Sequence, residues 1–374
     1  MPRQKEAGAA GVVLNHAREL EKRGHQVECW FLDDVLQRPA GSRRFEALSF
    51  SMAVAKGIWK DPKRFDVVNI HAPWGCVYST WRKYFSRCDA PACVLTMQGS
   101  EERYVRAMKL ENRKGRATNF NFKNQLWHRL YHQTMYDFSI RTADYGAVAN
   151  REAWICAELK YHRDPGRIRY VPNATEERFF SSRDFTNKPE VNLLYVGTWL
   201  DRKGVYYLAD AFSLVVNILP AIRLTVAGCS TSPDDVKKYF AIEVRDRVSV
   251  IPFITREDIH AVYAAHDVFV FPSLVEGMPL TLLEAMATGM PVITTNTCGM
   301  ADIVEDGFNG LLVQSADAHQ LAAGIEQLCR SVELREKLGL EGQRTARRYT
   351  WERVTCKLEE ILLIAAMQNG RSRK

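Results

Sequence analysis

Apolar residues in the first half of the chain are grouped in a way that predicts helices between short buried strands. Between 11 and 25 they stand at helical spacing, and Gly24 ends that segment. The residues that follow, 26–32, predict a strand. Further short apolar runs, each followed by polar residues, glycine or proline, predict strands at 66–71, 92–97, 145–149 and 168–171. This alternation of helices and strands is typical of an α/β domain with a parallel sheet.

The second half of the chain repeats the alternation more regularly. The pattern predicts strands at 191–196, 222–227, 248–252, 267–272 and 291–295, with helices at 204–219, 256–265 and 280–289. A polar stretch at 181–190 separates the two series and predicts a domain boundary. We therefore expect two doubly wound α/β domains, 1–185 and 186–350, and a last helix within 351–374 that packs back on the first domain.

The composition supports two folded domains and leaves the class of ligand open. A chain of 374 residues is long enough for two domains at roughly 100–200 residues each, and 46% hydrophobic residues exclude a disordered or collagen-like chain. The net charge of +7 is compatible with phosphorylated ligands, anionic membranes or nucleic acid. Because no apolar run approaches the ~20 residues of a membrane span and no signal peptide is evident, we expect a cytoplasmic protein.

The most informative candidate functional residues follow the strand that is predicted to end at Pro272. A loop then carries Glu276 and Gly277, and Pro279 is typical of a helix start. In open α/β sheets ligands bind beyond the carboxyl ends of the strands, where free N–H groups at a helix start favour an anion such as a diphosphate. Glu276 would lie beside that anion, and Glu284, a turn into the helix, would reach hydroxyls of the same ligand. This pattern is typical of a sugar-nucleotide site, although the spacing alone is also compatible with two solvated glutamates.

The spacing E-x7-E from Glu276 to Glu284, within EGMPLTLLEAMATGMPVITT and followed by GFNGLLV at 307–313, resembles the retaining family-four glycosyltransferases of GT-B fold. The resemblance extends to AGAAGVVLNHAREL at 7–20, YVPNA at 170–174, VG at 196–197 with RKG at 202–204, VAG at 226–228 and YTWE at 349–352. It implies two Rossmann-like domains that face each other across a cleft. It also implies retaining transfer of a sugar from a nucleotide-sugar donor to a glycan or lipid-linked acceptor, in cell-envelope or exopolysaccharide synthesis.

The resemblance further implies roles for individual residues. Arg202 and Lys203 would hold the leaving diphosphate, a group that gains negative charge in the transition state. Glu284 would accept hydrogen bonds from the ribose, and Glu276 would orient the transferred sugar, so Glu276, Arg202 and Lys203 are the catalytic candidates. Further donor-binding positions implied are Gly8, from the other domain, and Gly197, Thr198, Ile254, Gly277, Met278, Pro279 and Leu280. An Arg-Lys pair at such a place is otherwise compatible with a solvated turn.

Three features depart from the family pattern. Only six residues precede Ala7, so we expect the N-terminal sheet to lack its first strand. Thr198 stands where many relatives carry arginine, and Gln98 stands where relatives often place a histidine near the donor sugar. These departures keep open the alternative of a catalytically silent nucleotide-sugar-binding protein. No D-x-D motif or metal-ligand cluster is present in the sequence, so we expect no metal and no other cofactor.

The segment 101–142 is rich in basic and aromatic residues. With Gln98, its Arg103 and Arg106 are candidates for the acceptor side of the site. The segment could dock on an anionic membrane surface, through the region from Arg103 to Arg129, and admit a lipid-linked acceptor. The alternative is a helical hairpin whose charged face is solvated. Nucleic acid is not an expected partner, because no recognised binding motif accompanies the aromatic residues.

Overall fold

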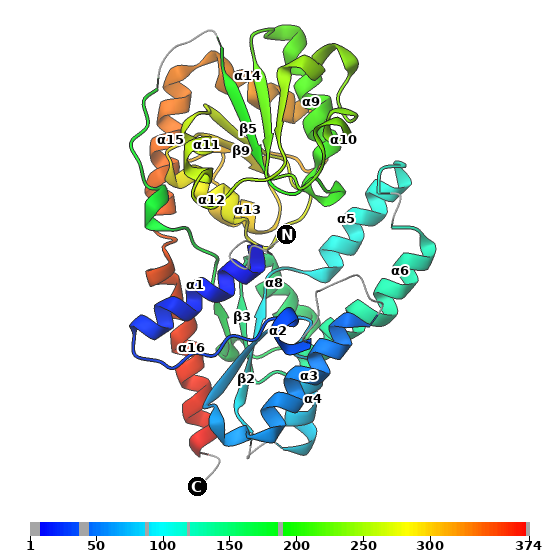
Figure 1. Cartoon of the computed structure of the whole chain (residues 1–374), viewed down its shortest axis with the longest axis vertical. Helices are drawn as coiled ribbons and strands as arrows, with labels where there is room; N and C mark the ends of the chain where they lie inside the picture. Colours follow the sequence, from blue (N-terminus) through cyan, green and yellow to red (C-terminus); the bar gives the residue numbers. More distant parts are fainter. Residues whose placement is uncertain (1–7, 37–44, 87–89, 118–119, 186–189, 372–374) are drawn as a thin grey trace. The chain divides into compact units, whose positions relative to one another are not determined.

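The computed structural model describes residues 8–36, 45–86, 90–117, 120–185 and 190–371 (Figure 1). The chain divides into two compact units. Unit 1 comprises Met1–Glu101, Asn121–Asn173 and Trp351–Lys374, and unit 2 comprises Glu102–Phe120 and Ala174–Thr350. Each unit is built on its own parallel sheet.

The sheet of unit 1 has four parallel strands, in the order β1 (Val67–His71), β2 (Ala92–Met97), β3 (Tyr145–Val148) and β4 (Ile168–Tyr170). Every residue of β2 and β3 is buried, as expected for inner strands that are covered on both faces. The predicted strands at 66–71, 92–97, 145–149 and 168–171 are therefore confirmed to within a residue or two. No described strand precedes β1, which lies at the edge of the sheet.

Helices cover both faces of this sheet (Figure 1). The long C-terminal helix α16 (Trp351–Arg371) packs along the strands, and α1 (Gly8–Lys22) packs against α16. On the other face, side chains of β2 and β3 form the core with α3 (Glu46–Lys60), α4 (Cys76–Phe85) and α7 (Thr134–Thr142). The core on this face includes Phe50, Ile58, Tyr78, Leu95 and Ile140.

The strand predicted at 26–32 is wrong. Residues 25–31 have no regular secondary structure, and the short helix α2 (Leu32–Leu36) begins where the strand was expected to end. Apolar side chains of this run nevertheless contribute to the core, because Trp30 and Leu32 pack against the core of unit 1. The ring of Trp30 also meets Phe65 edge to face at a centroid distance of 5.8 Å. Burial against side chains accounts for the apolar pattern without a neighbouring strand.

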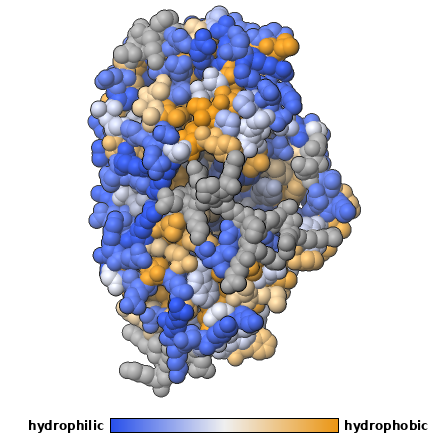
Figure 2. Space-filling model, in the orientation of Figure 1, coloured by the Kyte–Doolittle hydropathy of each residue, from blue (hydrophilic) through white to orange (hydrophobic). Residues whose placement is uncertain are grey.

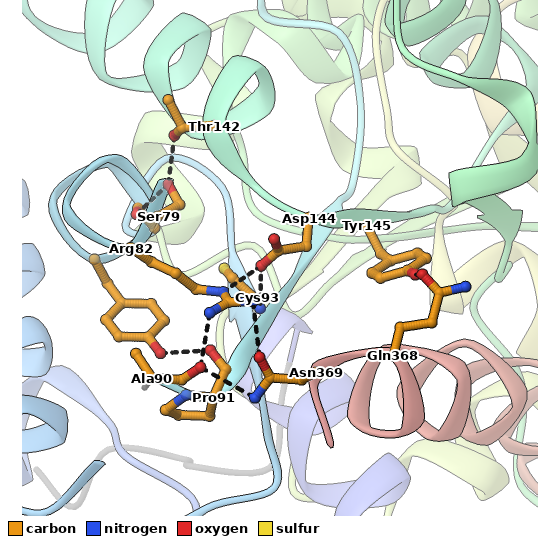
Figure 3. Close-up of polar contacts among 12 residues, drawn as sticks. Ser79, Arg82, Ala90, Pro91, Cys93, Thr142, Asp144, Tyr145, Gln368 and Asn369 are labelled. Carbon is orange, nitrogen blue, oxygen red and sulfur yellow. Dashed lines mark hydrogen bonds and ion pairs between the residues drawn. The ribbon is translucent and has the colours of Figure 1, made fainter. Parts of the chain in front are cut away.

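A buried polar network ties α16 to the rest of unit 1 (Figure 3). Nε of Arg82 lies 2.5 Å from Oδ2 of Asp144, and the other nitrogens of the same guanidinium donate to the carbonyl of Ala90 at 2.7 Å and to Oδ1 of Asn369 at 3.2 Å. Asp144 also accepts the backbone N–H of Cys93 at 2.8 Å. Arg82 is 5% exposed, so its charge is desolvated and depends on these partners.

The sheet of unit 2 has six parallel strands: β10 (Leu311–Val313), β9 (Val292–Thr295), β8 (Val268–Phe271), β5 (Asn192–Val196), β6 (Arg223–Ala227) and β7 (Val248–Ile251). The chain runs outward from β5 to β7, returns to β8 beside β5, and then runs outward in the other direction. This reversal defines a doubly wound sheet with a switch point between β5 and β8. Among the described strands, the reversal occurs in unit 2 only. The five strands predicted for this half are confirmed, whereas β10 was not predicted.

The helices of unit 2 follow its strands in turn. They are α9 (Val205–Ile218), α10 (Pro233–Lys237), α11 (Ile259–Ala264), α12 (Leu280–Ala287), α13 (Cys298–Ile303), α14 (Ala318–Arg330) and α15 (Val332–Ala346). The predicted helices at 204–219, 256–265 and 280–289 correspond to α9, α11 and α12. None of the helices in the described ranges is long and apolar enough to cross a membrane.

The division between the units differs from the boundary expected at 185. Residues 102–120, which include nearly all of α5 (Glu101–Arg113), belong to unit 2, where Met108 and Phe120 form an apolar cluster with Tyr207 and Leu274. Unit 2 also begins before the polar stretch at 181–190, at Ala174. The guanidinium of Arg183 accounts for part of this attachment, because it donates hydrogen bonds to three backbone carbonyls, those of Tyr263, His266 and Thr288.

Candidate functional site

The candidate site lies at the carboxyl edge of the sheet of unit 2. Strands β5 and β8 are hydrogen-bonded neighbours, with Leu193 paired to Val268 and Leu194 to Phe269. Because the two strands are parallel, the loop after β5 and the loop after β8 leave the sheet at the same edge. The first loop carries Arg202 and Lys203 and the second carries Glu276. The sequence-predicted catalytic candidates are therefore neighbours at the switch point of the sheet.

The carboxylate of Glu276 binds both cations through a single oxygen. Its Oε1 lies 2.6 Å from Nη1 of Arg202 and 2.6 Å from Nζ of Lys203. The hydroxyl of Ser273 donates to the same oxygen at 3.1 Å. The side chains of Glu276 and Lys203 are each 12% exposed, whereas that of Arg202 is 32% exposed. Two positive charges and one negative charge leave a net positive charge at this strand end, which suits an anionic ligand.

The backbones of the two loops are locked together. The 3₁₀ turn Asp201–Lys203 ends at Gly204, whose φ of +72° lies in the left-handed region. A Cβ at Gly204 would lie 1.9 Å from the carbonyl oxygen of Pro272, so only glycine fits here. The carbonyl of Arg202 accepts the N–H of Leu274 at 2.8 Å and the hydroxyl of Ser273 at 3.1 Å. The position of the two cations is thus fixed by the end of β8.

Lys203 lies in an environment that disfavours an isolated charge. Its ammonium is 5.0 Å from the centre of the Phe271 ring. Burial lowers the pKa of Lys203, while the charge of Glu276 opposes that change. A cation held out of water interacts more strongly with a bound anion than a solvated one does.

Glu284 lies on α12 and has different partners. The hydroxyl of Tyr263 donates to its Oε2 at 2.9 Å and also contacts the carbonyl of Thr281 at 3.2 Å. Burial raises the pKa of Glu284 to about 7. The hydrogen bond from Tyr263 acts against this rise, the charge of Glu176 adds to it, and the charges of Arg178 and Arg256 oppose it. Glu284 is thus a carboxylate that needs further hydrogen-bond donors to be fully ionised at neutral pH.

The loop between Glu276 and α12 is held by a close backbone contact. A Cβ at Gly299, in α13, would lie 2.0 Å from the carbonyl oxygen of Gly277. Met278 and Pro279 are buried, and Pro279 caps α12, whose first residue is Leu280. The close approach at this loop is therefore made by α13.

The remaining donor-binding candidates of unit 2 lie at the ends of other strands. Gly197 follows β5 with a φ of +152°, and the carbonyl of Thr198 accepts a hydrogen bond from the hydroxyl of Tyr195 at 3.0 Å. Ile254 is half-buried and follows β7. All of them lie on the same edge of the sheet as Arg202 and Glu276, because the sheet is parallel throughout.

Two candidates belong to unit 1. Gly8 is the exposed first residue of α1, with a φ of +58°. Gln98 follows β2, where its side-chain oxygen accepts a hydrogen bond from Asn173 at 3.3 Å and its carbonyl accepts one from Asn150 at 3.2 Å.

The acceptor-side candidates are not gathered within one unit. Gln98 lies in unit 1, whereas Arg103 and Arg106 lie on the part of α5 that belongs to unit 2. The sequence predicted that the region from Arg103 to Arg129 lies within the first domain. Residues 102–120 of this region instead belong to unit 2, and the residues from 121 onward belong to unit 1.

Several partners of these residues were not predicted from the sequence. Ser273 could have been found from its position at the end of a predicted strand. Tyr263 could not, because an aromatic residue on the buried side of a helix usually belongs to the core. Arg256 and Glu176, whose side chains are 2.6 Å apart, also carry no local signal. Within the described ranges, no group of three or more His, Cys, Asp or Glu side chains is arranged to hold a metal ion.

The part of the chain that carries this site is similar to known proteins. Residues 176–345 match the family model of the glycosyl transferases group 1. The chain is 30% identical over 180 residues to the UDP-Gal:alpha-D-GlcNAc-diphosphoundecaprenol alpha-1,3-galactosyltransferase of Escherichia coli, covering 45% of this chain and 46% of that protein. It is 31% identical over 190 residues to the O-antigen chain mannosyltransferase B of Escherichia coli, covering 50% and 49%. The chain thus spans about half the length of the curated relatives it matches.

The fold has close counterparts among solved structures. Anabaena HepE, crystallised in complex with UDP and glucose, superposes with a TM-score of 0.68, at 17% identity and with 96% of each chain covered. At that identity the likeness concerns the fold alone. Residues 176–345 thus match the glycosyl transferases group 1 family model, and the chain has the GT-B fold.

Proposed function

We propose that the chain is a retaining glycosyltransferase that works in the cytoplasm. It moves a sugar from a nucleotide-sugar donor to a glycan or lipid-linked acceptor in the synthesis of a cell-envelope or extracellular polysaccharide. The names of the two Escherichia coli relatives, one acting on a diphosphoundecaprenol substrate and one on an O-antigen chain, support the acceptor class. The HepE complex with UDP and glucose supports the donor class.

The observation that carries this proposal is the pair of cations on Glu276. A nucleotide sugar leaves as a nucleoside diphosphate, and its oxygens gain negative charge as the bond to the sugar breaks. Arg202 and Lys203, both 2.6 Å from one carboxylate oxygen, are positioned by the backbone of two strand ends. The N-terminus of α12 adds its positive dipole at the same edge. These groups supply fixed positive charge for the diphosphate, so the reaction we propose needs no metal ion.

The two carboxylates have separate tasks in this proposal. When the diphosphate binds, Arg202 and Lys203 turn to its oxygens, and the carboxylate of Glu276 is released to accept hydrogen bonds from the sugar. Glu284 accepts hydrogen bonds from the ribose hydroxyls, which supply the donors that its buried carboxylate lacks. The neighbouring backbone of Gly277, Met278, Pro279 and Leu280 lines the sugar and the phosphates.

The transfer itself is proposed to occur on one face of the sugar. The acceptor oxygen bonds to the anomeric carbon while the bond from that carbon to the diphosphate oxygen breaks. The proton of the acceptor hydroxyl moves to the departing diphosphate oxygen. Glu276 orients the sugar and Arg202 and Lys203 stabilise the leaving group, so no side chain has to act as a nucleophile.

Transfer from a panel of UDP-, GDP- and ADP-sugars to oligosaccharide and lipid-linked acceptors tests the function. We expect one donor to give a glycosidic product with the anomeric configuration of the donor, detected by NMR. The Arg202→Ala/Lys203→Ala variant should form product at least ~10³-fold more slowly, and Lys238→Ala, on the exposed surface of unit 2, should behave as wild type. An inverted product would contradict the mechanism. Binding of a donor without any turnover would support the silent binding protein instead.

A further inference from the structure

Unit 1 carries an apolar groove on its surface, outside the site described above. Its volume is about 330 Å³, and eight described residues line it: Cys76, Val77, Thr80, Trp81 and Phe85 of α4, with Thr134, Met135 and Phe138 of α7. The two threonine hydroxyls have partners within the protein. That of Thr134 donates to the carbonyl of Arg129 at 3.3 Å, and that of Thr80 lies 3.4 Å from the hydroxyl of Thr142. The groove therefore offers contacts to hydrocarbon.

Large apolar side chains are exposed where the groove opens. Phe85 is 79% exposed and Tyr84 is 64% exposed at the end of α4, and Phe138 of α7 is 50% exposed. In the space-filling view of Figure 2, pale orange residues interrupt the blue surface over the part of unit 1 where α3 and α4 lie in Figure 1. Exposed apolar patches of this kind mark interaction surfaces.

A stripe of apolar residues leads to the groove along the helix that contains α7. This helix runs through α6 (Phe122–His128), a π-helical turn (Arg129–Gln133) and α7. Every fourth residue from Phe122 to Phe138 is apolar except Thr134, and Phe122, Leu126 and Leu130 are 80%, 47% and 65% exposed. A repeat of four overshoots the α-helical turn by about 40° per step. The π-helical turn has more residues per turn, so it reduces this rotation and keeps the stripe on one face of the helix.

The charges on this surface favour an anionic partner. Lys83 is exposed beside Phe85 and donates to the carbonyl of Arg141 at 2.9 Å, and Lys123 and Arg129 are exposed on the stripe helix. Of the acidic groups that face them, Asp137 accepts hydrogen bonds from Tyr161 and Gln133, each at 2.6 Å. Glu101 is bound to His128 at 2.5 Å. The three exposed cations thus outnumber these two acidic groups, both of which are already bonded to other side chains.

We propose that this surface docks unit 1 on an anionic lipid bilayer, with Phe85 and Phe138 inserted among the acyl chains and one chain lying in the groove. A soluble glycan would need polar partners that the groove lacks. The combination of an apolar stripe and flanking cations is that of an interfacial helix, which gains affinity both from buried apolar area and from attraction to anionic headgroups. The inference concerns unit 1 alone and does not depend on the proposed sugar transfer.

Vesicle co-sedimentation tests the docking surface. The full chain should bind phosphatidylcholine vesicles that contain phosphatidylglycerol at least tenfold more tightly than pure phosphatidylcholine vesicles, at low salt. Phe85→Ser/Phe138→Ser should weaken binding at least tenfold at low and at high salt, because it removes the inserted groups. Lys123→Glu/Arg129→Glu should weaken binding at low salt and converge with wild type at high salt, because salt screens its contribution.

Matched variants in unit 2 are the controls. Ile242→Ser/Phe308→Ser removes two apolar residues that are 72% and 45% exposed, and Lys238→Glu/Arg330→Glu reverses two exposed charges. Both should bind vesicles as wild type does. Absence of wild-type binding to the anionic vesicles, or equal losses in the Phe85/Phe138 and Ile242/Phe308 variants, would overturn the proposal.

Quenching of tryptophan fluorescence locates the acyl chain. Trp81 lines the groove, so lipids with brominated acyl chains should quench the wild-type chain more than Trp81→Phe. Equal quenching of the two would show that the groove stays empty and would contradict its occupancy by a chain. Binding of a nucleotide sugar by Phe85→Ser/Phe138→Ser should be unchanged, which separates a failure of docking from a failure of the donor site.

Discussion

The ammonium of Lys203 lies 2.6 Å from Oε1 of Glu276, and the two side chains are each 12% exposed. The pair joins the loop after β5 to the loop after β8, and Arg202 shares the same carboxylate oxygen. Glu276 thus neutralises part of the positive charge that we assign to binding the donor diphosphate. These three side chains hold one another in place, and we expect a bound donor to redistribute their contacts.

Loss of the two cations should abolish most of the catalytic effect. Removing one preorganised donor to a developing oxyanion typically costs about 10²–10³-fold in kcat. We expect Arg202→Ala/Lys203→Ala to lower kcat/KM by at least ~10³-fold, and either single variant to be milder because the other cation remains. Steady-state kinetics with the preferred donor measure this. A single variant as damaging as the double one would contradict independent contributions.

Substitution of Glu284 and substitution of Glu276 should have different effects, the first on donor binding and the second on turnover. Glu284→Gln should raise the Kd of the nucleotide sugar, because the ribose contact is present in the ground state and the transition state alike. Glu276→Gln should mainly lower kcat, because it changes the orientation of the reacting sugar. Titration calorimetry and kinetics on both variants decide this. Equal, small effects on both would contradict the assigned roles.

Donor affinity should depend on the ionisation of Glu284. Burial raises the pKa of its carboxyl to about 7, and ribose hydroxyls hydrogen-bond best to the ionised form. Affinity for an intact nucleotide sugar should therefore rise as pH increases through about 7, and binding near pH 7 should release protons. Calorimetry in buffers of different ionisation enthalpy measures the release, and Glu284→Gln should abolish it. Affinity that is independent of pH in wild type would contradict the assignment.

The same carboxyl should affect stability with the opposite dependence on pH. A folded-state pKa of about 7 lies above the ordinary value of 4.5, so the folded state prefers the protonated form. Destabilisation by Glu284 is absent below about pH 4.5 and develops fully above about pH 7. Glu284→Gln should raise the Tm of the empty protein by a few degrees at pH 8 and leave it unchanged at pH 4.5.

Gly204 should be more sensitive to substitution than its backbone angle alone implies. Gly204 and Gly307 have similar φ values of +72° and +69°, yet a Cβ at Gly307 would meet nothing within 4 Å, whereas one at Gly204 would lie 1.9 Å from the carbonyl oxygen of Pro272. Gly307→Ala should cost about 1–2 kcal/mol of backbone strain. Gly204→Ala should cost more and should also weaken nucleotide binding, because it displaces the Arg202-Lys203 turn. Thermal melts and calorimetry compare the two, and equal effects would contradict the close contact.

Much of unit 2 could be predicted from the sequence because its strands are continuous apolar runs that end at glycine, proline or polar residues. The motif around Glu276 and Glu284 also lies within one strand-loop-helix segment, so local spacing placed both residues. The prediction of a strand at 26–32 was wrong for a physical reason. Trp30 and Leu32 are partly buried by side-chain packing, and periodicity does not distinguish such burial from pairing in a sheet.

The long-range contacts could not be predicted from the sequence. Nothing local shows that residues 102–120 leave unit 1 to pack Met108 and Phe120 against Tyr207 and Leu274. The partner of Glu284, Tyr263, lies 21 positions away on another helix. Sequence patterns describe single elements, whereas these contacts depend on how the elements fold against one another.

The most direct test of the donor site is the release of nucleoside diphosphate from UDP-, GDP- and ADP-sugars, measured together with donor binding on the same protein samples. For at least one donor, the wild-type chain should show saturable binding and turnover, and the Arg202→Ala/Lys203→Ala variant should lose both. A wild-type chain that binds none of these donors would contradict the account. So would a double variant that binds and turns over the donor as well as wild type does.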